Sequence, residues 1–328
     1  MTLVPWVVML LCVSLPRAQG LIFSEIYVVS DEHSSVNLTC PMAFSGPLTW
    51  THGDQPLDSD NAQVQGHNLI LNDIWHGEYS CWNGERKLGS VYLLEALKED
   101  GAGGTDSSIS CWAKSYDCII TCIWTNSEFS TVRLGLGHAC THGQENCTWV
   151  YPATNLQNKG FHFNLSHSLS PYTEEITPLV VTAEAINEFK YLRKTKRFYL
   201  RDIVQPDSPT VVTCLMNGEN LEVKVEPPTT WNSPPSYFPL EHQIAYILKD
   251  NGEEKHSMEL HIPKYVSKVR VRSRDPLVPS AWSQWTPWKN IIGDKKDKRN
   301  KGKYIIRCNA GGKKGNKTKS RPAMSANH

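Results

Sequence analysis

Three arginines and two tryptophans lie close enough in the sequence to form a stack of cation–π contacts. Residues 269–274 alternate between valine or serine and arginine, so an extended strand places Arg270, Arg272 and Arg274 on one face. Trp282 and Trp285 follow on the adjacent segment, where their rings can lie between the guanidinium groups. A cation over an indole face contributes about 0.5–2 kcal/mol, and several such contacts in series stiffen a sheet. The alternative is a basic edge strand beside an ordinary aromatic turn.

The first twenty residues predict a secretory signal. An apolar run from Val7 to Leu15 precedes Ala18-Gln19-Gly20, which offers small residues at the two positions that a signal peptidase inspects. No later stretch reaches 18 consecutive apolar residues, so we expect no membrane-spanning helix. The chain is therefore expected to be secreted and extracellular, with neither a membrane nor a nucleic acid among its partners.

Cysteine content and glycosylation signals agree with an oxidising compartment. The chain has ten cysteines, nine of them after removal of the signal that holds Cys12. The odd number leaves at least one thiol that is free or bonded to another chain. Four N-x-S/T sequons are candidate N-glycosylation sites. They are Asn37, Asn146, Asn164 and Asn316.

One cluster of histidines and cysteines has the spacing of a metal site. It comprises His138, Cys140, His142 and Cys147. In a secreted chain such cysteines more often form disulfides, so we expect no metal and no other cofactor. The sequence also lacks a G-x-S-x-G motif, a phosphate-binding glycine loop and a Ser/His/Asp grouping that can be placed at one site. The chain is therefore predicted not to be an enzyme.

Length and charge indicate several β-domains and a basic tail. A chain of 328 residues suits two or three domains of about 100 residues each. Eleven Trp and twenty Pro with few long helical runs favour small β-domains joined by turns. Net charge is +1, yet residues 293–328 carry twelve Lys and Arg against two Asp, which leaves the body mildly acidic. We interpret this tail as disordered.

Residues 21–100 predict an immunoglobulin-like sandwich. Cys40, Trp50, Tyr79 and Cys81 follow the order of the immunoglobulin pin, in which a Trp packs on a disulfide between the sheets. Closing a loop of roughly 40 residues stabilises by about 4 kcal/mol on the chain-entropy model. Trp75 departs from the pattern, because an Asp is usual at its position. A glycine-rich linker follows at residues 99–104.

Two further β-domains follow the linker. In residues 101–205, Cys111 and Cys122, with Trp124 two positions on, fit a short antiparallel hairpin closed by a disulfide. Residues 206–292 contain short strand patterns separated by turn-rich segments, which favours a fibronectin type III sandwich. A proline-containing elbow at residues 205–209 separates the two. The predicted fold class is all-β: an N-terminal immunoglobulin-like sandwich followed by two fibronectin type III sandwiches.

Taken together, these motifs resemble a known family. The run Trp282-Ser283-Gln284-Trp285-Thr286 is similar to the W-S-x-W-S box of class I cytokine receptors, and Thr286 keeps the hydroxyl of its last Ser. The C-x10-C-x-W run resembles the first conserved hairpin of cytokine-receptor modules. Domain order and short runs such as residues 201–207 and 231–238 resemble the family of interleukin-12 beta subunits, which are shared with interleukin-23.

The resemblance implies a receptor-like chain that binds a four-helix alpha subunit at the elbow between its second and third domains. The pair would be secreted as one heterodimeric cytokine and presented to a cell-surface receptor. In the family, an Arg of the helical partner enters a pocket built from an acidic residue and tyrosines. The matching positions are Tyr116, Glu174, Tyr237 and Asp275, with Leu277 where the family places another aromatic. A carboxylate with flanking rings suits a guanidinium.

Each pocket residue also has an alternative interpretation. Asp275 can pair with Arg274 at the surface, a contact that contributes at most about 1 kcal/mol. Tyr116 and Tyr237 can be packing residues whose hydroxyls bond to backbone groups. Glu174 can be a solvated loop charge.

The cysteines depart from the family pattern. The family's beta chain has a loop cysteine in the second domain that bonds to the helical partner, and residues 167–175 here contain none. Cys140–Cys147 and Cys214–Cys308 are candidate pairs. We hypothesise that an interchain bond uses one of the unassigned cysteines, or that the heterodimer is non-covalent. The unassigned cysteines are Cys118, Cys140, Cys147, Cys214 and Cys308.

Two rival functions fit part of the sequence. A soluble decoy receptor has the same modules, but it would bind its cytokine reversibly after both chains are made. An extracellular glycan-binding protein would use the basic tail, which can bind heparin-like glycans through counterion release. Co-assembly during secretion separates the first rival from a cytokine subunit, and deletion of residues 293–328 tests the second.

Overall fold

The computed structural model describes residues 21–30, 35–57, 61–98, 108–156, 160–217, 219–293 and 305–310. The predicted signal, the predicted linker, Asn316 and most of the basic tail therefore lie outside the described residues. The chain divides into two compact units. Unit 1 comprises Met1–Ser110, Ile123–Phe163 and Val180–Lys196, and unit 2 comprises Cys111–Cys122, Asn164–Leu179 and Arg197–His328.

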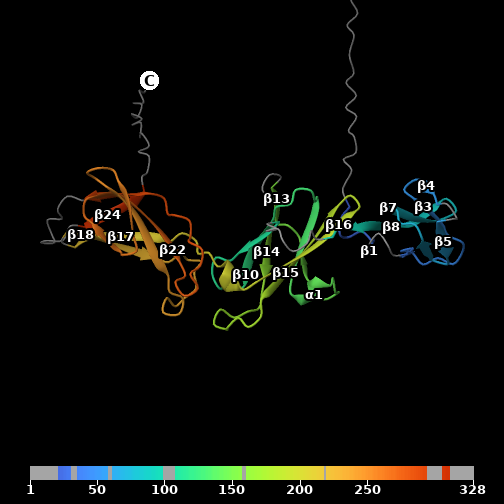
Figure 1. The fold of residues 1–328 in the computed structure, drawn as a ribbon, viewed down its shortest axis with the longest axis horizontal. Coiled ribbons are helices and arrows are strands. Elements are labelled where there is room, and N and C mark those ends of the chain that lie inside the picture. The colour runs from blue at the N-terminus through green and yellow to red at the C-terminus, as the bar shows by residue number, and fades with distance from the viewer. Residues whose placement is uncertain are drawn as a thin grey trace, which may run out of the picture. The chain divides into compact units, whose positions relative to one another are not determined.

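Both units are built from β-strands, as Figure 1 shows, and the predicted all-β fold class is confirmed. Among the described residues, the helices are two single turns, α1 (His138–Thr141) and α2 (Leu200–Ile203). No helix in this part of the chain is long and apolar enough to cross a bilayer. The division into three sandwich domains stays a prediction.

The immunoglobulin pin lies in the apolar core of the first part of unit 1. Cys40 and Cys81 form a disulfide, and Trp50 belongs to the same buried cluster. The Tyr79 hydroxyl donates to the Trp75 carbonyl at 2.7 Å. One sheet has the order β2-β6-β5, and β1, β3, β4, β7 and β8 belong to a second sheet. The strands are β1 (Tyr27–Ser30), β2 (Val36–Thr39), β3 (Thr49–His52), β4 (Gln55–Pro56), β5 (Ala62–Gln65), β6 (Asn68–Leu71), β7 (Gly77–Asn83) and β8 (Arg86–Ala96).

The second sheet continues beyond the immunoglobulin-like strands. Its order is β12-β11-β15-β16-β8-β7-β3-β4, with β1 paired to β8, so strands from either side of residue 100 share one sheet. A separate sheet has the order β13-β14-β10-β9. The additional strands are β9 (Ile109–Trp112), β10 (Ile119–Trp124), β11 (Thr131–Leu136), β12 (Trp149–Val150), β13 (Thr154–Leu156), β14 (Gly160–Ser166), β15 (Leu179–Asn187) and β16 (Lys190–Phe198).

An eight-stranded sheet forms the remainder of unit 2, in the order β20-β19-β22-β23-β24-β17-β18-β21. Strand β22 alternates as the sequence predicts, with Val269 and Val271 fully buried in its core cluster. The arginines of β22 therefore face the other way. The strands are β17 (Thr210–Asn217), β18 (Asn220–Glu226), β19 (Glu241–Leu248), β20 (Glu254–Ser257), β21 (His261–Pro263), β22 (Val266–Arg274), β23 (Lys289–Gly293) and β24 (Ile305–Ala310).

Strand β24 corrects the expectation that the whole tail from residue 293 onward is disordered. It pairs antiparallel with β23 from Lys289↔Ala310 to Gly293↔Ile306, and with β17 at Cys214↔Ile306. The run Tyr304-Ile305-Ile306 interrupts the basic composition of the tail. The high charge around this short β-prone run favours disorder when only the sequence is considered. In the fold, the edges of β23 and β17 provide hydrogen-bonding partners for it.

Candidate functional site

Asp275 is the centre of the candidate site. It follows the last residue of β22 and is 2% exposed. One carboxylate oxygen accepts the Tyr116 hydroxyl at 2.9 Å, and the other accepts the Leu277 amide at 2.7 Å. The Asp275 amide donates to the Ser280 hydroxyl at 3.0 Å. Backbone and side-chain bonds therefore hold this carboxylate in one orientation.

No cation pairs with Asp275 among the described residues of unit 2. The neighbouring Arg274 forms its ion pair with Glu241 instead, so the alternative of a surface Asp275–Arg274 pair is wrong. A buried carboxylate that has hydrogen-bond donors but no counter-charge is costly, because its removal from water is only partly compensated. This imbalance distinguishes Asp275 from the ion-paired acidic residues around it.

A cluster of aromatic side chains reaches Asp275 through the Tyr116 hydroxyl. Tyr116 contacts Trp231 and Phe238, with ring centroids 5.9 and 5.8 Å apart. Tyr237 and Tyr172 are 59% and 54% exposed and meet edge to face at 5.2 Å. The Tyr172 ring also lies 5.4 Å from Phe238. Buried and exposed rings thus form one continuous cluster in unit 2.

Tyr172 is the member of this cluster that sequence reasoning missed. It lies two residues before Glu174, in a loop without strand or helix periodicity. Its hydroxyl donates to the Ser233 carbonyl at 3.1 Å, which holds the ring against the Tyr237 segment. The only indication in the sequence is a tyrosine inside a turn-rich loop. The neighbouring residues do not indicate which aromatic rings it contacts.

Hydrogen bonds also fix the Tyr116 turn to the segment that carries the other rings. The Asn232 side chain accepts the Tyr116 amide at 2.7 Å and donates to the Asp117 carboxylate at 2.7 Å. Burial, followed by the Asp275 charge, raises the pKa of Tyr116 above its ordinary value. The phenol therefore stays protonated and donates to Asp275 over the physiological pH range.

Glu174 and its neighbour have different environments. Glu174 is exposed, as the solvated-loop alternative expects, whereas Glu175 is partly buried. The Glu175 carboxylate accepts the Leu200 amide at 2.6 Å and the Arg201 amide at 3.2 Å, and it pairs with the Arg201 guanidinium at 3.6 Å. Glu175 is therefore satisfied at the start of α2, whereas the buried Asp275 has no cationic partner among the described residues of unit 2.

Arginines and tryptophans of unit 2 stack as the sequence pattern indicates. The Arg272 guanidinium lies between two indoles, 4.8 Å from Trp282 and 4.5 Å from Trp285. Burial, then the charges of Arg270 and Arg274, lowers the pKa of Arg272. The other stacked pairs are Arg274 over Trp282 at 4.5 Å, Arg270 over Trp285 at 4.7 Å and Arg270 over Trp288 at 4.4 Å. Trp288 extends the predicted stack by one ring.

Two hydroxyls fix the tryptophan segment to β22. The Ser283 hydroxyl accepts the Ser273 amide at 2.9 Å, and the Thr286 hydroxyl accepts the Val271 amide at 2.9 Å. Backbone amides of Ser283 and Thr286 donate back to the Ser273 and Val271 carbonyls. Thr286 thus supplies the hydroxyl that its position requires. The stack stiffens the strand that ends beside Asp275.

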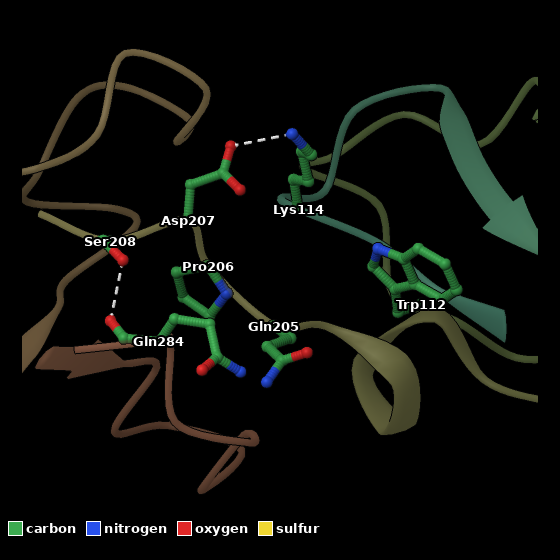
Figure 2. A pocket seen from close by; sticks show the side chains of 7 residues that line it. All are labelled: Trp112, Lys114, Gln205, Pro206, Asp207, Ser208 and Gln284. Atoms are coloured by element: carbon green, nitrogen blue, oxygen red, sulfur yellow. Dashed lines mark hydrogen bonds and ion pairs between the residues drawn. The ribbon is translucent and has the colours of Figure 1, made fainter. Parts of the chain in front are cut away.

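A separate cavity of about 190 Å³ also lies in unit 2 (Figure 2). Its edge includes a Lys114–Asp207 ion pair at 3.0 Å and a Ser208 hydroxyl that donates to the Gln284 carbonyl at 2.7 Å. The cavity is smaller than typical small-molecule sites of about 300–1,000 Å³, and none of the predicted pocket residues lines it. Its lining residues are Trp112, Lys114, Gln205, Pro206, Asp207, Ser208 and Gln284.

The observed disulfides reduce the number of cysteines that could bond to a partner chain. Disulfides join Cys40 to Cys81, Cys111 to Cys122 and Cys140 to Cys147. Cys214 is also disulfide-bonded, and its pairing with Cys308 stays a prediction. Among the described residues, Cys118 is the free cysteine, and it is exposed. The His/Cys cluster that resembled a metal site contains a disulfide, and no metal-binding group occurs in the described part of the chain.

The three sequon asparagines within the described residues are exposed. They are Asn37 on β2, Asn146 in the loop before Cys147 and Asn164 on β14. Asn164 accepts the Thr121 hydroxyl at 3.2 Å. Their exposure is compatible with glycan attachment, which stays a prediction.

Stacked arginines beside tryptophans, with two hydroxyls bonded to the same strand, are the arrangement expected of a W-S-x-W-S box. Together with the all-β fold, this arrangement places the chain among cytokine-receptor-like proteins. A family model described as "Cytokine interleukin-12p40 C-terminus" matches residues 106–187.

Curated relatives named interleukin-12 subunit beta match most of the chain. The Felis catus protein is 31% identical over 303 residues, which cover 80% of this chain and 90% of the relative. The Ovis aries protein is 30% identical over 286 residues, with 76% and 85% covered, and the Homo sapiens protein is 28% identical over 283 residues, with 76% and 84% covered. The chain belongs to the interleukin-12 subunit beta family. It is therefore a cytokine subunit and not an enzyme.

Proposed function

We propose that this chain is the beta subunit of a heterodimeric cytokine and binds a four-helix alpha subunit through the site around Asp275. The observation that carries the proposal is a carboxylate that is 2% exposed and has no cation among the described residues. A guanidinium from the partner would supply the missing counter-charge. Its planar donors suit a carboxylate and can stack on nearby aromatic rings.

Exposed side chains of the aromatic cluster, together with Leu277, support a protein partner. Tyr172 and Tyr237 are more than half exposed, and Leu277 is 69% exposed. Binding hot spots typically combine a desolvated polar centre with aromatic groups that exclude water. Partner association would bury these three side chains. Affinity would then depend both on the Asp275 charge and on the apolar surface of these side chains.

Secretion of the pair and presentation to a cell-surface receptor are further parts of the proposal. Three disulfides among the described residues support folding in an oxidising compartment. The relatives are named as subunits of a cytokine, which supports assembly with another chain. The immunoglobulin-like strands β1–β8 contain none of the Asp275 site residues, and we assign receptor contact to them.

The decisive experiment is co-secretion of this chain with candidate four-helix chains, followed by affinity measurement on two variants. Asp275→Asn keeps an acceptor for the Leu277 amide and removes the charge. Tyr237→Ala removes an exposed ring. We expect each to weaken the complex by about 2 kcal/mol or more, roughly 30-fold in Kd. Asp207→Ala is the matched control, because that carboxylate pairs with Lys114 outside the site.

Unchanged affinity in both variants would reject the Asp275 site. A complex that forms only when the finished chains are mixed would favour the decoy alternative. Glycan binding through the basic tail stays a separate prediction. A chain lacking residues 311–328 that retains all affinity for heparin-like glycans would contradict it for that part of the tail.

A further inference from the structure

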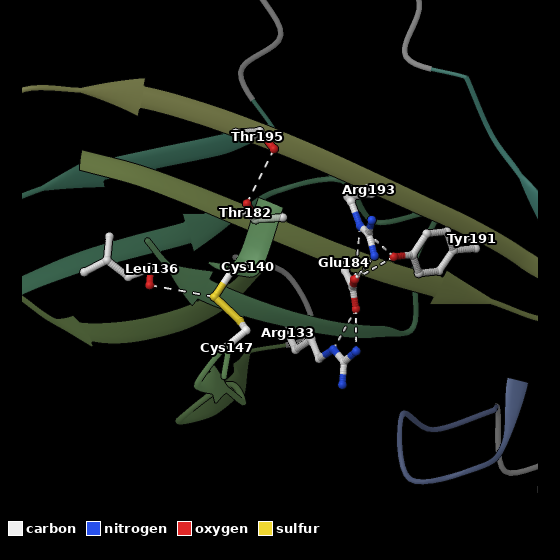
Figure 3. Close-up of a disulfide and its surroundings, with 9 residues drawn as sticks. All are labelled: Arg133, Leu136, Cys140, Cys147, Thr182, Glu184, Tyr191, Arg193 and Thr195. Atoms are coloured by element: carbon white, nitrogen blue, oxygen red, sulfur yellow. Dashed lines mark hydrogen bonds and ion pairs between the residues drawn. A yellow bond between two sulfur atoms is a disulfide. The ribbon is translucent and has the colours of Figure 1, made fainter. Parts of the chain in front are cut away.

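A buried carboxylate in unit 1 bonds to two arginines and a tyrosine (Figure 3). Glu184 on β15 is 1% exposed. One of its oxygens accepts the Arg133 Nε at 2.8 Å, and the other accepts the Arg193 Nη2 at 2.7 Å and the Tyr191 hydroxyl at 2.6 Å. Such charge-assisted bonds are short, directional and costly to break singly, because the remaining partners stay buried with unbalanced charge.

Arg133 also contacts residues 21–27, which lead into β1 and include its first residue. Its Nη2 donates to the Tyr27 hydroxyl at 3.0 Å, and its guanidinium lies 4.2 Å from the Phe23 ring and 4.3 Å from the Trp149 ring. The adjacent Thr131 hydroxyl donates to the Leu21 carbonyl at 3.0 Å. Residues 21–27, which we name the N-terminal segment, are thereby bonded to strand β11.

Backbone pairing also connects the immunoglobulin-like strands to strand β16, and we call this contact region the joint. Strand β16 pairs in parallel with β8, at Lys190↔Glu95 and Tyr191↔Ala96. The Glu95 amide donates to the Phe189 carbonyl at 2.8 Å, and the Leu97 amide donates to the Tyr191 carbonyl at 2.8 Å. A small apolar cluster lies beside these bonds. Its buried members are Phe23, Leu94, Ile186 and Tyr191.

We infer that Arg133 and Glu184 are positioning residues that fix the immunoglobulin-like strands β1–β8 to strands β11, β12, β15 and β16, which continue the β8 sheet. Three sets of contacts act together: strand pairing, the contacts of Arg133 and Thr131 with the N-terminal segment, and the Glu184 network that holds Arg133 in place. All of them lie outside residues 99–104, the predicted linker. Relative motion is the usual expectation for neighbouring domains joined by a linker, and here the joint is fixed instead.

The geometry makes Arg133 the residue on which this joint depends. Its side chain is 14% exposed, against 38% for Arg193. Arg133 bonds to Glu184 and contacts the N-terminal segment, whereas Arg193 bonds within the β15–β16 hairpin. The Arg133 Nε and Nη2 both donate to one Glu184 oxygen. Lysine lacks the planar fork that holds two such donors in place while the charge lies between two rings. The inference does not rest on any partner of the chain.

Hydrogen exchange of the Glu95 and Leu97 amides tests this inference in the full chain, because both amides bond across the joint. We expect Arg133→Ala to raise their exchange rates about tenfold, with little change at the Thr51 and Ser80 amides within the immunoglobulin-like sheet. Arg201→Ala is the matched control, since it breaks a partly exposed ion pair with Glu175 in unit 2. It should leave the joint amides unchanged.

Two results would overturn the inference: unchanged exchange at Glu95 and Leu97, or an equal rise at the joint and within the immunoglobulin-like sheet. If Arg133→Ala is not secreted, Tyr27→Phe provides a milder perturbation, because it removes only the hydroxyl that accepts from Arg133. We expect a several-fold rise at the same two amides in that variant. No rise there would equally reject the inference.

Discussion

Removal of one hydroxyl tests how the buried charge at Asp275 is maintained. Tyr116→Phe deletes the donor that lies 2.9 Å from the carboxylate and keeps the ring that contacts Trp231 and Phe238. Packing is therefore nearly conserved, and the substitution isolates a single hydrogen bond. The Leu277 amide remains as the second donor.

The expected cost of Tyr116→Phe follows from the type of bond. Hydrogen bonds to charged groups contribute about 1.5–3 kcal/mol, and loss of one partner leaves the other group desolvated. Asp275 is 2% exposed, so water has little access to replace the phenol. We expect the free energy of opening of the β22 region to fall by about 1.5–3 kcal/mol, which corresponds to a rise in amide exchange of roughly 10- to 150-fold.

The assay is hydrogen exchange of the Val271 and Ser273 amides, which bond to the Thr286 and Ser283 hydroxyls. Repeating it in an Asp275→Asn background completes a double-mutant cycle. The neutral amide still accepts a bond but carries no charge, so Tyr116→Phe should cost clearly less there.

A coupling free energy below about 0.5 kcal/mol in this cycle would refute the reasoning. Equal cost in both backgrounds would mean that the phenol stabilises the site through packing rather than through the charge. Tyr172→Phe is the control, because that hydroxyl bonds to the Ser233 carbonyl instead.

Two further predictions concern ionisable groups outside the site. The isolated chain, without reductant, should take up a maleimide label at Cys118, which is free and exposed. Peptide mapping checks this, and a Cys118→Ser variant that still carries label on the same peptide would contradict it. Burial raises the pKa of Tyr79 to about 12. Because the unfolded phenol loses its proton near pH 10, this contribution is fully present below pH 10 and is lost as the pH rises towards 12. Tyr79→Phe should therefore show a smaller drop in urea midpoint between pH 9 and pH 11, and an identical drop would disprove the assignment.

Local patterns predicted the parts of the fold that depend on nearby residues. Strict alternation placed Val269 and Val271 inside and the arginines outside, because a strand has a period of two. The Cys40, Trp50, Tyr79 and Cys81 pattern combines fixed spacing with a disulfide. Such features constrain a fold with little help from distant segments.

Features that depend on contacts between distant residues could not be predicted from the sequence. Pairing of β8 with β16 joins residues almost 100 positions apart, across a glycine-rich run that indicates a boundary. Tyr172 meets Tyr237 through a loop with no periodicity. Glu174 and Glu175 are equivalent by composition, and only the position of α2 decides which one is satisfied. Tertiary geometry, rather than propensity, settles each of these.

The order of synthesis gives strand β24 a particular consequence. It lies between β23 and β17, two places from β22 in the sheet, yet it is the last strand described along the chain. A nascent chain that has not reached residue 305 has two uncovered strand edges, which can template pairing with other chains. The sheet whose strand β22 ends beside Asp275 is thus completed only after residue 310 has been synthesised, and a product truncated before residue 305 would expose the unpaired edges of β23 and β17.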